Sequence, residues 1–286
     1  MIKHKVSFIA SLFILGNILT PLAYADDDSF FTNWLENVSQ TQESQPHWMT
    51  PLVTVTPRLE QEYRFDYSHS DKPKSVVLDN YGGGKGLEFI PSENTEIIVG
   101  IPAYEDQSTP KTSTTGTGWG DESLLLKYRI ATANEEHGNY IVSAFLGASI
   151  PTGSDLFTNH HTIVTPTIAV GKGWGDRDSG FDIQSTLGIS VPTAGVDTLG
   201  RLMVWNTAFQ GHIWKFWPEI ETGYTHWYGG EHAGKNQLVV TYGTTIGRFE
   251  IEKRVKATVG LGYQTVQGAQ EVNLQHGIVT TLRVTF

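Results

Sequence analysis

The chain has 286 residues, a formal net charge of −10 at pH 7 and no cysteine. An acidic balance argues against nucleic acid as a partner, because nucleic-acid binding needs a basic face. The lack of cysteine excludes disulfides and thiolate chemistry. Thirty glycines and 11 tyrosines, with charged residues at 17%, indicate many turns and amphipathic aromatic side chains.

The first 25 residues have the parts of a secretory signal peptide. Lys3 and Lys5 give a positive start, residues 6–19 form an apolar run, and residues 23–25 (Ala-Tyr-Ala) fit a small-x-small cleavage site. The run is shorter than the roughly 20 residues that span a bilayer, which favours cleavage over retention as an N-terminal anchor. Because no later stretch of about 18 consecutive apolar residues follows, we expect an exported protein without helical membrane spans.

Residues 26–50 do not alternate, and large apolar side chains recur there at helical spacing: Phe30, Phe31, Trp34, Leu35 and Val38. Asp28 or Ser29 is available as an N-cap. The pattern predicts a short amphipathic helix followed by a polar linker, and both lie in the periplasm if the residues that follow form an outer-membrane barrel. Packing on the barrel rim or membrane surface is the favoured role, because most apolar helical stripes are simply buried; a plug or partner-docking helix is the alternative.

From Pro51 onward, apolar and polar residues alternate with period two, the pattern of strands that have one apolar face. We predict twelve strands, many of them longer than the five or six residues usual in soluble proteins. A tilted membrane-crossing strand needs about 9 to 11 residues, so the lengths favour a membrane barrel over a soluble sandwich. The predicted ranges are 52–68, 76–90, 95–105, 121–131, 139–151, 162–172, 179–192, 200–212, 214–227, 237–248, 254–266 and 276–286.

The links between these runs are mostly long and short in turn, as outer-membrane barrels require, with long loops outside and tight turns in the periplasm. We therefore predict an all-β fold: a transmembrane antiparallel barrel of about 12 strands over residues 51–286, in the bacterial outer membrane. A closed barrel pairs its last strand with its first, so the chain can end inside the wall. The final strand and its terminal Phe286 look like the signal that barrel-assembly machinery reads.

Several stretches resemble a known family. They are GTGWGDESLLLKYRI (116–130), SIPTGS (149–154), GKGWGD with FDIQSTLGISVPT (171–193) and WKFWPEIETGYT (214–225). They resemble the bacterial outer-membrane proteins grouped as putative transporters of the meta-pathway of phenol degradation, over roughly residues 50–286. The resemblance implies an outer-membrane β-barrel with a role in solute passage. Residues 26–50 lie outside it.

If the apolar faces meet outer-membrane lipid, the lumen receives a nearly balanced set of charges. A narrow, charged lumen could pass small solutes, aromatic or hydrophobic ones among them, as a passive channel. The same charges could instead pair and close the lumen of a structural barrel whose loops or N-terminal helix meet a partner. The residues predicted to line the lumen are Arg58, Glu60, Glu62, Arg64, Asp66, Glu88, Glu96, Lys127, Arg129, Asp182, Glu219, Glu221, Lys256 and Arg283.

Catalysis is a distant third hypothesis. The sequence has no nucleophile elbow and no zinc-protease motif. The loop histidines His160, His161, His226 and His232 fit no compact zinc spacing. We therefore predict no catalytic residue, no metal site and no cofactor. The sequence leaves the oligomeric state open.

Overall fold

The computed structural model describes residues 30–83, 85–109, 114–267 and 272–286. The predicted signal peptide and the N-cap candidates Asp28 and Ser29 lie outside these residues. The strands are β1 (Glu62–Lys72), β2 (Val76–Tyr81), β3 (Gly86–Ser92), β4 (Thr95–Val99), β5 (Tyr104–Thr109), β6 (Thr114–Trp119), β7 (Glu122–Ala133), β8 (Tyr140–Ile150), β9 (Ile163–Gly175), β10 (Ser179–Pro192), β11 (Leu202–Ile213), β12 (Phe216–Trp227), β13 (Asn236–Glu250), β14 (Lys256–Gln267) and β15 (His276–Thr285).

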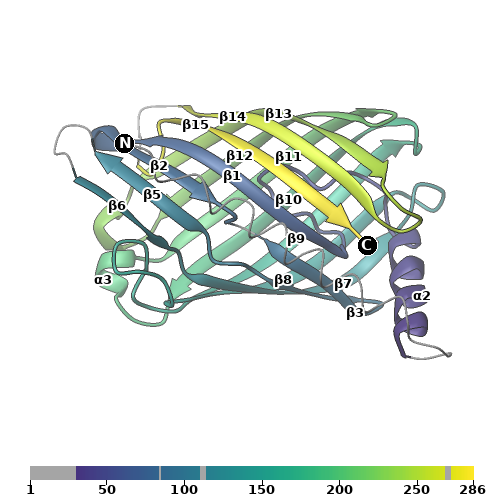
Figure 1. Ribbon diagram of the computed structural model, residues 1–286, viewed down its shortest axis with the longest axis horizontal. Coiled ribbons are helices and arrows are strands. Elements are labelled where there is room, and N and C mark those ends of the chain that lie inside the picture. The colour runs from purple at the N-terminus through teal and green to yellow at the C-terminus, as the bar shows by residue number, and fades with distance from the viewer. Residues whose placement is uncertain (1–29, 84, 110–113, 268–271) are drawn as a thin grey trace, which may run out of the picture.

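Twelve of these strands form a closed antiparallel barrel in the order β1-β3-β4-β7-β8-β9-β10-β11-β12-β13-β14-β15. Pairing of β15 with β1, from Glu62 opposite Thr285 to Asp71 opposite His276, closes the ring (Figure 1). The barrel of about 12 strands is thus confirmed, and so is a final strand that needs no open edge because it pairs with the first.

The other three strands continue ring strands beyond short interruptions. Residues 82–85, 100–103 and 120–121 separate β2 from β3, β4 from β5 and β6 from β7. The interruptions are rich in glycine, which tolerates conformations such as the φ of +89° at Gly82. The sheet nevertheless continues past them as β1-β2-β5-β6. The loop at 151–162 covers the outer edge of β6, where the Ser154 amide donates to the Trp119 carbonyl over 2.8 Å.

The two faces of the wall have opposite polarity. On β7, Leu126, Tyr128 and Ile130 point outward and are about half exposed, whereas Lys127 between them points inward and is fully buried. A soluble sandwich would place the apolar faces against each other. Here they look outward all round the barrel, as the alternation predicted.

Links at one end of the barrel are short, such as residues 214–215 and 176–178, and those at the other are longer, such as 151–162 and 228–235. We call these the short-turn end and the long-loop end. The alternation of short and long links agrees with the sequence pattern.

Besides α2, the described part of the chain has three single-turn helices, all at the long-loop end: η2 (Pro73–Ser75), α3 (Val196–Leu199) and η3 (Gly230–His232). No helix in the described part of the chain has the length and apolar character needed to cross a membrane.

The predicted N-terminal helix is present as α2 (Phe30–Glu43), lying across the short-turn end (Figure 1). Val38 is fully buried against Leu59 and Ile90. The indole Nε1 of Trp34 donates to the Ile90 carbonyl over 2.6 Å. Phe30 remains 75% exposed, so the inner half of the apolar stripe is what docks the helix.

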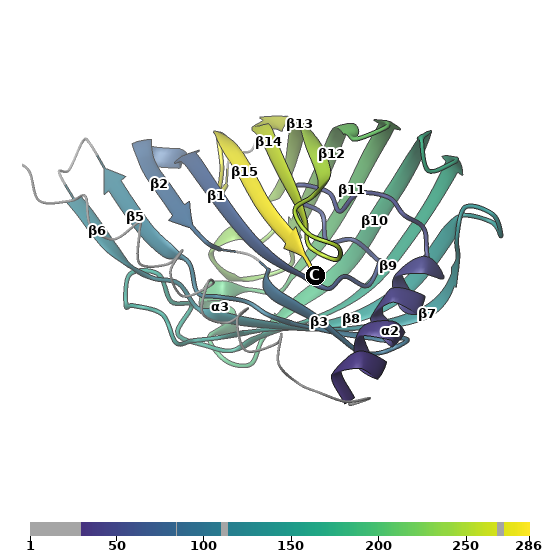
Figure 2. The ribbon, with the colours of Figure 1, turned by 45° about the vertical axis from the view of Figure 1, so that its right-hand side comes forward.

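The predicted strand at 52–68 is wrong in its first half, because the wall begins at Glu62. Residues 44–61, which we call the lumen segment, loop through the barrel interior between α2 and β1 (Figure 2). Alternation marks an extended backbone with two different faces, and it does not specify whether neighbouring strands or side chains satisfy that backbone. In the lumen, side chains satisfy it.

Replacing Val38 with Asp should release α2 from the barrel end while the barrel stays folded. A buried, unpaired carboxylate between Leu59 and Ile90 is unfavourable by several kcal/mol, more than an isolated short helix can offset. Limited proteolysis should cut the helix at least tenfold faster. Asn37→Asp, which adds the same charge on the exposed face, is the control; equal cleavage of the two variants would contradict the docking contact.

Candidate functional site

The lumen segment has buried backbone but makes no strand pairing. Its residues 45–60 have no backbone–backbone hydrogen bond with a described strand. Buried carbonyl and amide groups need partners, since an unpaired one weakens the fold by roughly 1–3 kcal/mol. Inward-facing side chains of the wall supply partners, and so do Gln45 and Arg58 of the segment itself, which bond the Leu59 and Trp48 backbone.

Two arginines on adjacent wall strands hold the carbonyls at the tip of the lumen segment. Arg283 on β15 donates to the Thr50 carbonyl and, over 2.7 Å, to the Pro51 carbonyl. Arg64 on β1 donates to the Pro51 and Leu52 carbonyls. Its Nε also lies 2.8 Å from the Asp66 carboxylate, which fixes the guanidinium in place.

A carboxylate holds the amides of the same tip from the other side. Glu221 on β12 accepts the Val53 amide over 2.8 Å and the Thr54 amide over 2.6 Å, one on each oxygen. The cationic and anionic side chains of the lumen therefore meet carbonyl and amide groups respectively. Charged groups make hydrogen bonds about twice as strong as neutral ones do.

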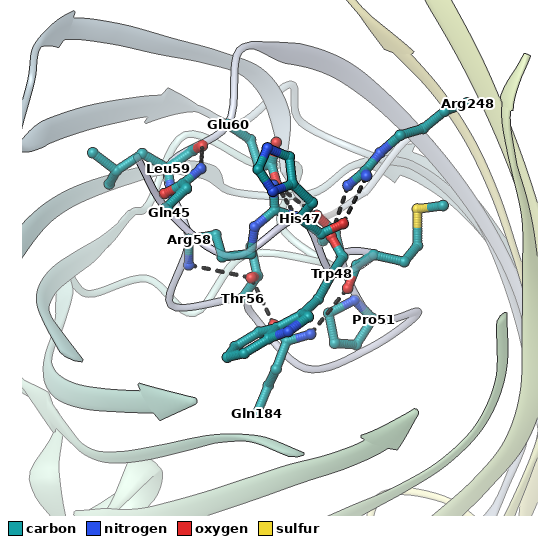
Figure 3. Close-up of polar contacts among 12 residues, drawn as sticks. Gln45, His47, Trp48, Pro51, Thr56, Arg58, Leu59, Glu60, Gln184 and Arg248 are labelled. Atoms are coloured by element: carbon teal, nitrogen blue, oxygen red, sulfur yellow. Dashed lines mark hydrogen bonds and ion pairs between the residues drawn. The ribbon is translucent and has the colours of Figure 1, made fainter. Parts of the chain in front are cut away.

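Closer to α2, Arg248 and Gln184 hold residues 47–49, the limb of the lumen segment that leads from α2 to its tip (Figure 3). Arg248 donates to the His47 and Trp48 carbonyls, each over 2.7 Å. The amide of Gln184 on β10 donates to the Met49 carbonyl over 2.9 Å and accepts the Thr56 hydroxyl over 2.7 Å. Gln184 thus binds both limbs of the loop.

Residues 57–60, the limb that leads from the tip to β1, lie against β4, β7 and β8. Lys127 lies 2.8 Å from Glu96, and both are fully buried. Its ammonium group also donates to the Arg58 carbonyl over 3.2 Å, while Glu96 accepts the Glu60 amide over 2.6 Å. The pair therefore gains from the lumen segment the extra hydrogen bonds that a buried ion pair needs.

Wall glycines form sockets for two side chains of the lumen segment. A Cβ added at Gly171 or Gly173 on β9 would lie 2.5 or 2.4 Å from the Trp48 indole. A Cβ at Gly260 or Gly262 on β14 would lie 2.6 or 2.9 Å from Leu52. Any larger residue would collide, so these inward glycines match the position of the segment.

At the rim of the short-turn end, ion pairs fasten the junction between α2 and the lumen segment. Nδ1 of His47 lies 2.8 Å from Glu135 in the β7–β8 turn, and the His47 amide donates to the same carboxylate over 2.6 Å. Although burial acts to raise it, these hydrogen bonds lower the pKa of Glu135 to about 2. A hydrogen bond from Arg177 lowers the pKa of Glu43.

The lumen segment does not fill the barrel evenly. A cavity of about 380 Å³ remains beside Val55, lined by β4 and β7 to β10. Its lining is mostly apolar, with Ile98, Leu125 and Ile163 prominent, and includes several hydroxyl groups and one charged residue, Lys85. We call this space the side cavity.

Twelve of the fourteen residues predicted to line the lumen lie on inward faces of the wall. They are Glu62, Arg64 and Asp66 on β1, Glu88 on β3, Glu96 on β4, Lys127 and Arg129 on β7, Asp182 on β10, Glu219 and Glu221 on β12, Lys256 on β14 and Arg283 on β15. Arg58 and Glu60 belong to the lumen segment, with Nη1 of Arg58 2.8 Å from Glu60, so their assignment to the wall was wrong. Whether any of these residues contacts a solute stays a prediction.

Sequence reasoning missed Arg248, Gln184 and the glycine sockets. Even-numbered side chains of β13 point outward, so alternation alone would place Arg248 outside. A bulge near Gly247 and the φ of +59° at Arg248 instead turn its side chain toward the lumen segment. Gln184 carries no charge, whereas every residue predicted to line the lumen is charged. The sequence does carry a signal for the sockets: Gly171 and Gly173 alternate with the large residues Val170, Lys172 and Trp174, and glycine on one face of a strand indicates that another group approaches that face closely.

Within the described ranges, no group of three or more His, Asp or Glu residues is placed to hold a metal ion. His160 and His161 lie in the loop after β8, His226 on β12 and His232 in η3.

No family model and no curated protein matches the chain, so the resemblance to the meta-pathway family is not confirmed. Among solved structures, the chain is similar to an outer membrane channel from Pseudomonas putida F1, with 14% identity and a TM-score of 0.54. That match covers 78% of this chain and 92% of the other. A bacterial polysaccharide outer membrane secretin matches over 79% and 97% at 9% identity and a TM-score of 0.36. The first likeness supports the fold.

Gly171→Leu should displace Trp48 from its socket, because overpacking of this kind weakens a packed contact by about 1–3 kcal/mol. In a Met49→Cys background, which contains one cysteine, a small maleimide should label the lumen segment at least fivefold faster. Gly211→Leu is the control, since a Cβ there meets nothing closer than 4.0 Å. Unchanged labelling in Gly171→Leu would contradict the socket.

The rim contacts should weaken in acid. Because the pKa of Glu135 is lowered from 4.5 to about 2, its contribution is full above pH 4.5 and is lost as the pH falls toward 2. Glu43 acts in the same direction. A spin label at Asn33→Cys on α2 should become mobile across this range. Glu43→Gln with Glu135→Gln should give a label that is already more mobile at pH 7 and lacks the transition; an identical transition in both proteins would contradict this account.

Proposed function

We propose that the protein is a passive outer-membrane channel for small solutes whose lumen is closed by residues 44–61 and opens when that segment shifts. The observation that carries this proposal is the manner of closure. The lumen segment is joined to the wall by side chains and by no strand pairing, so it can move without breaking the barrel ladder. The outward apolar face and the likeness in fold to an outer membrane channel support the membrane setting.

The contacts of the lumen segment suit a reversible closure. Each net hydrogen bond contributes about 0.5–1.5 kcal/mol, and those to charged groups about 1.5–3 kcal/mol. A solute that takes over a few of these contacts could therefore shift the segment. α2 fixes one end at the rim and β1 fixes the other, so a displaced segment stays tethered and can return.

The side cavity supports aromatic or hydrophobic solutes over sugars or free amino acids. A polar solute needs a dense set of donors and acceptors, whereas the cavity offers mostly aliphatic side chains. Its volume lies at the lower end of the range for small-molecule sites.

A second function rests on the same closure. The filled, ion-paired lumen also suits a structural barrel whose exposed helix α2, with Phe30 and Phe31 outward, meets a partner. Such a barrel has no use for a movable segment. Passage of ions or solutes through the lumen therefore separates the two functions.

The chain has no cysteine, so a single engineered disulfide can fasten the lumen segment. An added Cβ at Gly262 lies 2.9 Å from the Cδ1 atom at the end of the Leu52 side chain, so Leu52→Cys and Gly262→Cys face each other and can form a disulfide after a small shift. In planar bilayers, the oxidised double variant should conduct at least tenfold less than the reduced one. The two single variants are the controls and should not respond to reductant.

Arg64→Gln together with Arg283→Gln should have the opposite effect, because the carbonyls of residues 50–52 lose their donors. This variant should conduct more than the wild-type protein, and small apolar solutes such as benzyl alcohol should reduce the current more than glycerol does. Equal conductance of oxidised and reduced disulfide variants would show that the segment does not gate. Silence of the loosened variant as well would favour the structural barrel.

A further inference from the structure

Lys85 is a buried cation without a partner. It lies between β2 and β3, is 8% exposed, and its ammonium nitrogen makes no hydrogen bond and no ion pair within the described residues. Other buried cations of this lumen are bonded: Lys127 to Glu96, Arg64 to Asp66, and Arg283 to the Thr50 and Pro51 carbonyls. Burying a charge without a partner is unfavourable.

Lys85 also lines the side cavity, where it is the one charged residue. The rest of the lining consists of aliphatic side chains, glycine and alanine, and the hydroxyls of Ser123, Ser149, Thr165 and Ser190. The cavity therefore combines a large apolar surface with a single positive group. Ligand sites commonly have this form, in which one charged group fixes the orientation of an apolar molecule.

The charges around Lys85 favour an anion over a cation. The charged groups with the largest effect on its ammonium group are Arg64, Glu88, Lys127 and Arg283, three of them positive. Within the described residues, neither the Lys85 ammonium nitrogen nor the Glu88 carboxylate has a hydrogen-bond partner. An entering carboxylate would thus meet more positive than negative charge among these four groups.

We propose that the side cavity binds an apolar monocarboxylate, with the carboxylate on the Lys85 ammonium group and the apolar body against Ile98, Leu125 and Ile163. This assignment rests on the proposed passage of small apolar solutes and names their chemical class. The ligand lies beside Val55 of the lumen segment, so that an occupied cavity touches the element that closes the lumen. A neutral or cationic molecule of the same size gains the apolar contacts but leaves Lys85 unpaired or repelled.

Octanoate, octanol and octylammonium form a matched series of probes that differ in charge at one end. Isothermal titration of the purified barrel in a non-ionic detergent, corrected for titration into detergent alone, should show octanoate binding at least tenfold more tightly than either analogue. A charge-assisted hydrogen bond in a buried site accounts for a factor of this size. Equal binding of octanoate and octanol would overturn the proposal.

Lys85→Met removes the charge and keeps the length of the side chain. Octanoate should then bind no more than twofold better than octanol, while octanol binding is unchanged. Lys85→Arg should keep the preference, and Lys253→Met, at an exposed lysine near the short-turn end, should bind as the wild-type protein does. An octanoate preference that survives in Lys85→Met would also overturn the assignment.

Leu125→Trp gives a test that does not alter Lys85. Filling the cavity should weaken octanoate and octanol alike, and unchanged binding of both would place the ligand elsewhere and overturn the assignment. Failure of this inference is distinct from failure of the proposed function. If the Leu52–Gly262 disulfide closes the channel but the protein shows no octanoate preference, the carboxylate site is contradicted and the proposed function is not. If the protein prefers octanoate but never conducts, the site is supported and the proposed solute passage is contradicted.

Discussion

The structure depends on how the buried backbone of residues 44–61 is satisfied. An extended chain inside a barrel cannot join a strand ladder, yet its amides and carbonyls are removed from water and need partners. Arg64 and Arg283 provide donors to its carbonyls, and Glu221 provides acceptors to its amides. The charged side chains of the lumen therefore form hydrogen bonds with the backbone of the segment as well as ion pairs with one another.

This arrangement also explains how a narrow barrel tolerates so many buried charges. Desolvating an ion is unfavourable by several kcal/mol, and one opposite charge rarely offsets it unless further hydrogen bonds are made. Lys127 and Glu96 illustrate the solution, since each pairs with the other and also bonds a backbone group of the lumen segment. Lys85 is the exception, and it borders the side cavity beside Val55.

Position in the lumen is fixed by shape as well as by charge. Trp48 and Leu52 occupy sockets where the wall has glycine on alternate positions of β9 and β14. At the rim, His47, Glu135, Glu43 and Arg177 hold the start of the segment beside α2. The segment is thus anchored at three levels by contacts that do not belong to the barrel ladder, and the wall can remain intact whichever position the segment takes.

The sequence by itself determined the wall. Period-two alternation, strand length and the order of long and short links predicted a closed antiparallel barrel with its apolar face outward. The spacing of apolar residues predicted a short helix within residues 26–50, which the structure places at Phe30–Glu43. These are local patterns, so one chain segment carries each of them. Arg58 and Glu60 show the limit, because alternation continues through residues 52–61 although they lie inside the barrel. Only the tertiary structure decided that these residues lie in the lumen and bond to the wall, that a bulge turns Arg248 inward and that Lys85 is left unpaired. Each of these depends on which distant side chains meet one backbone, and no local pattern records that.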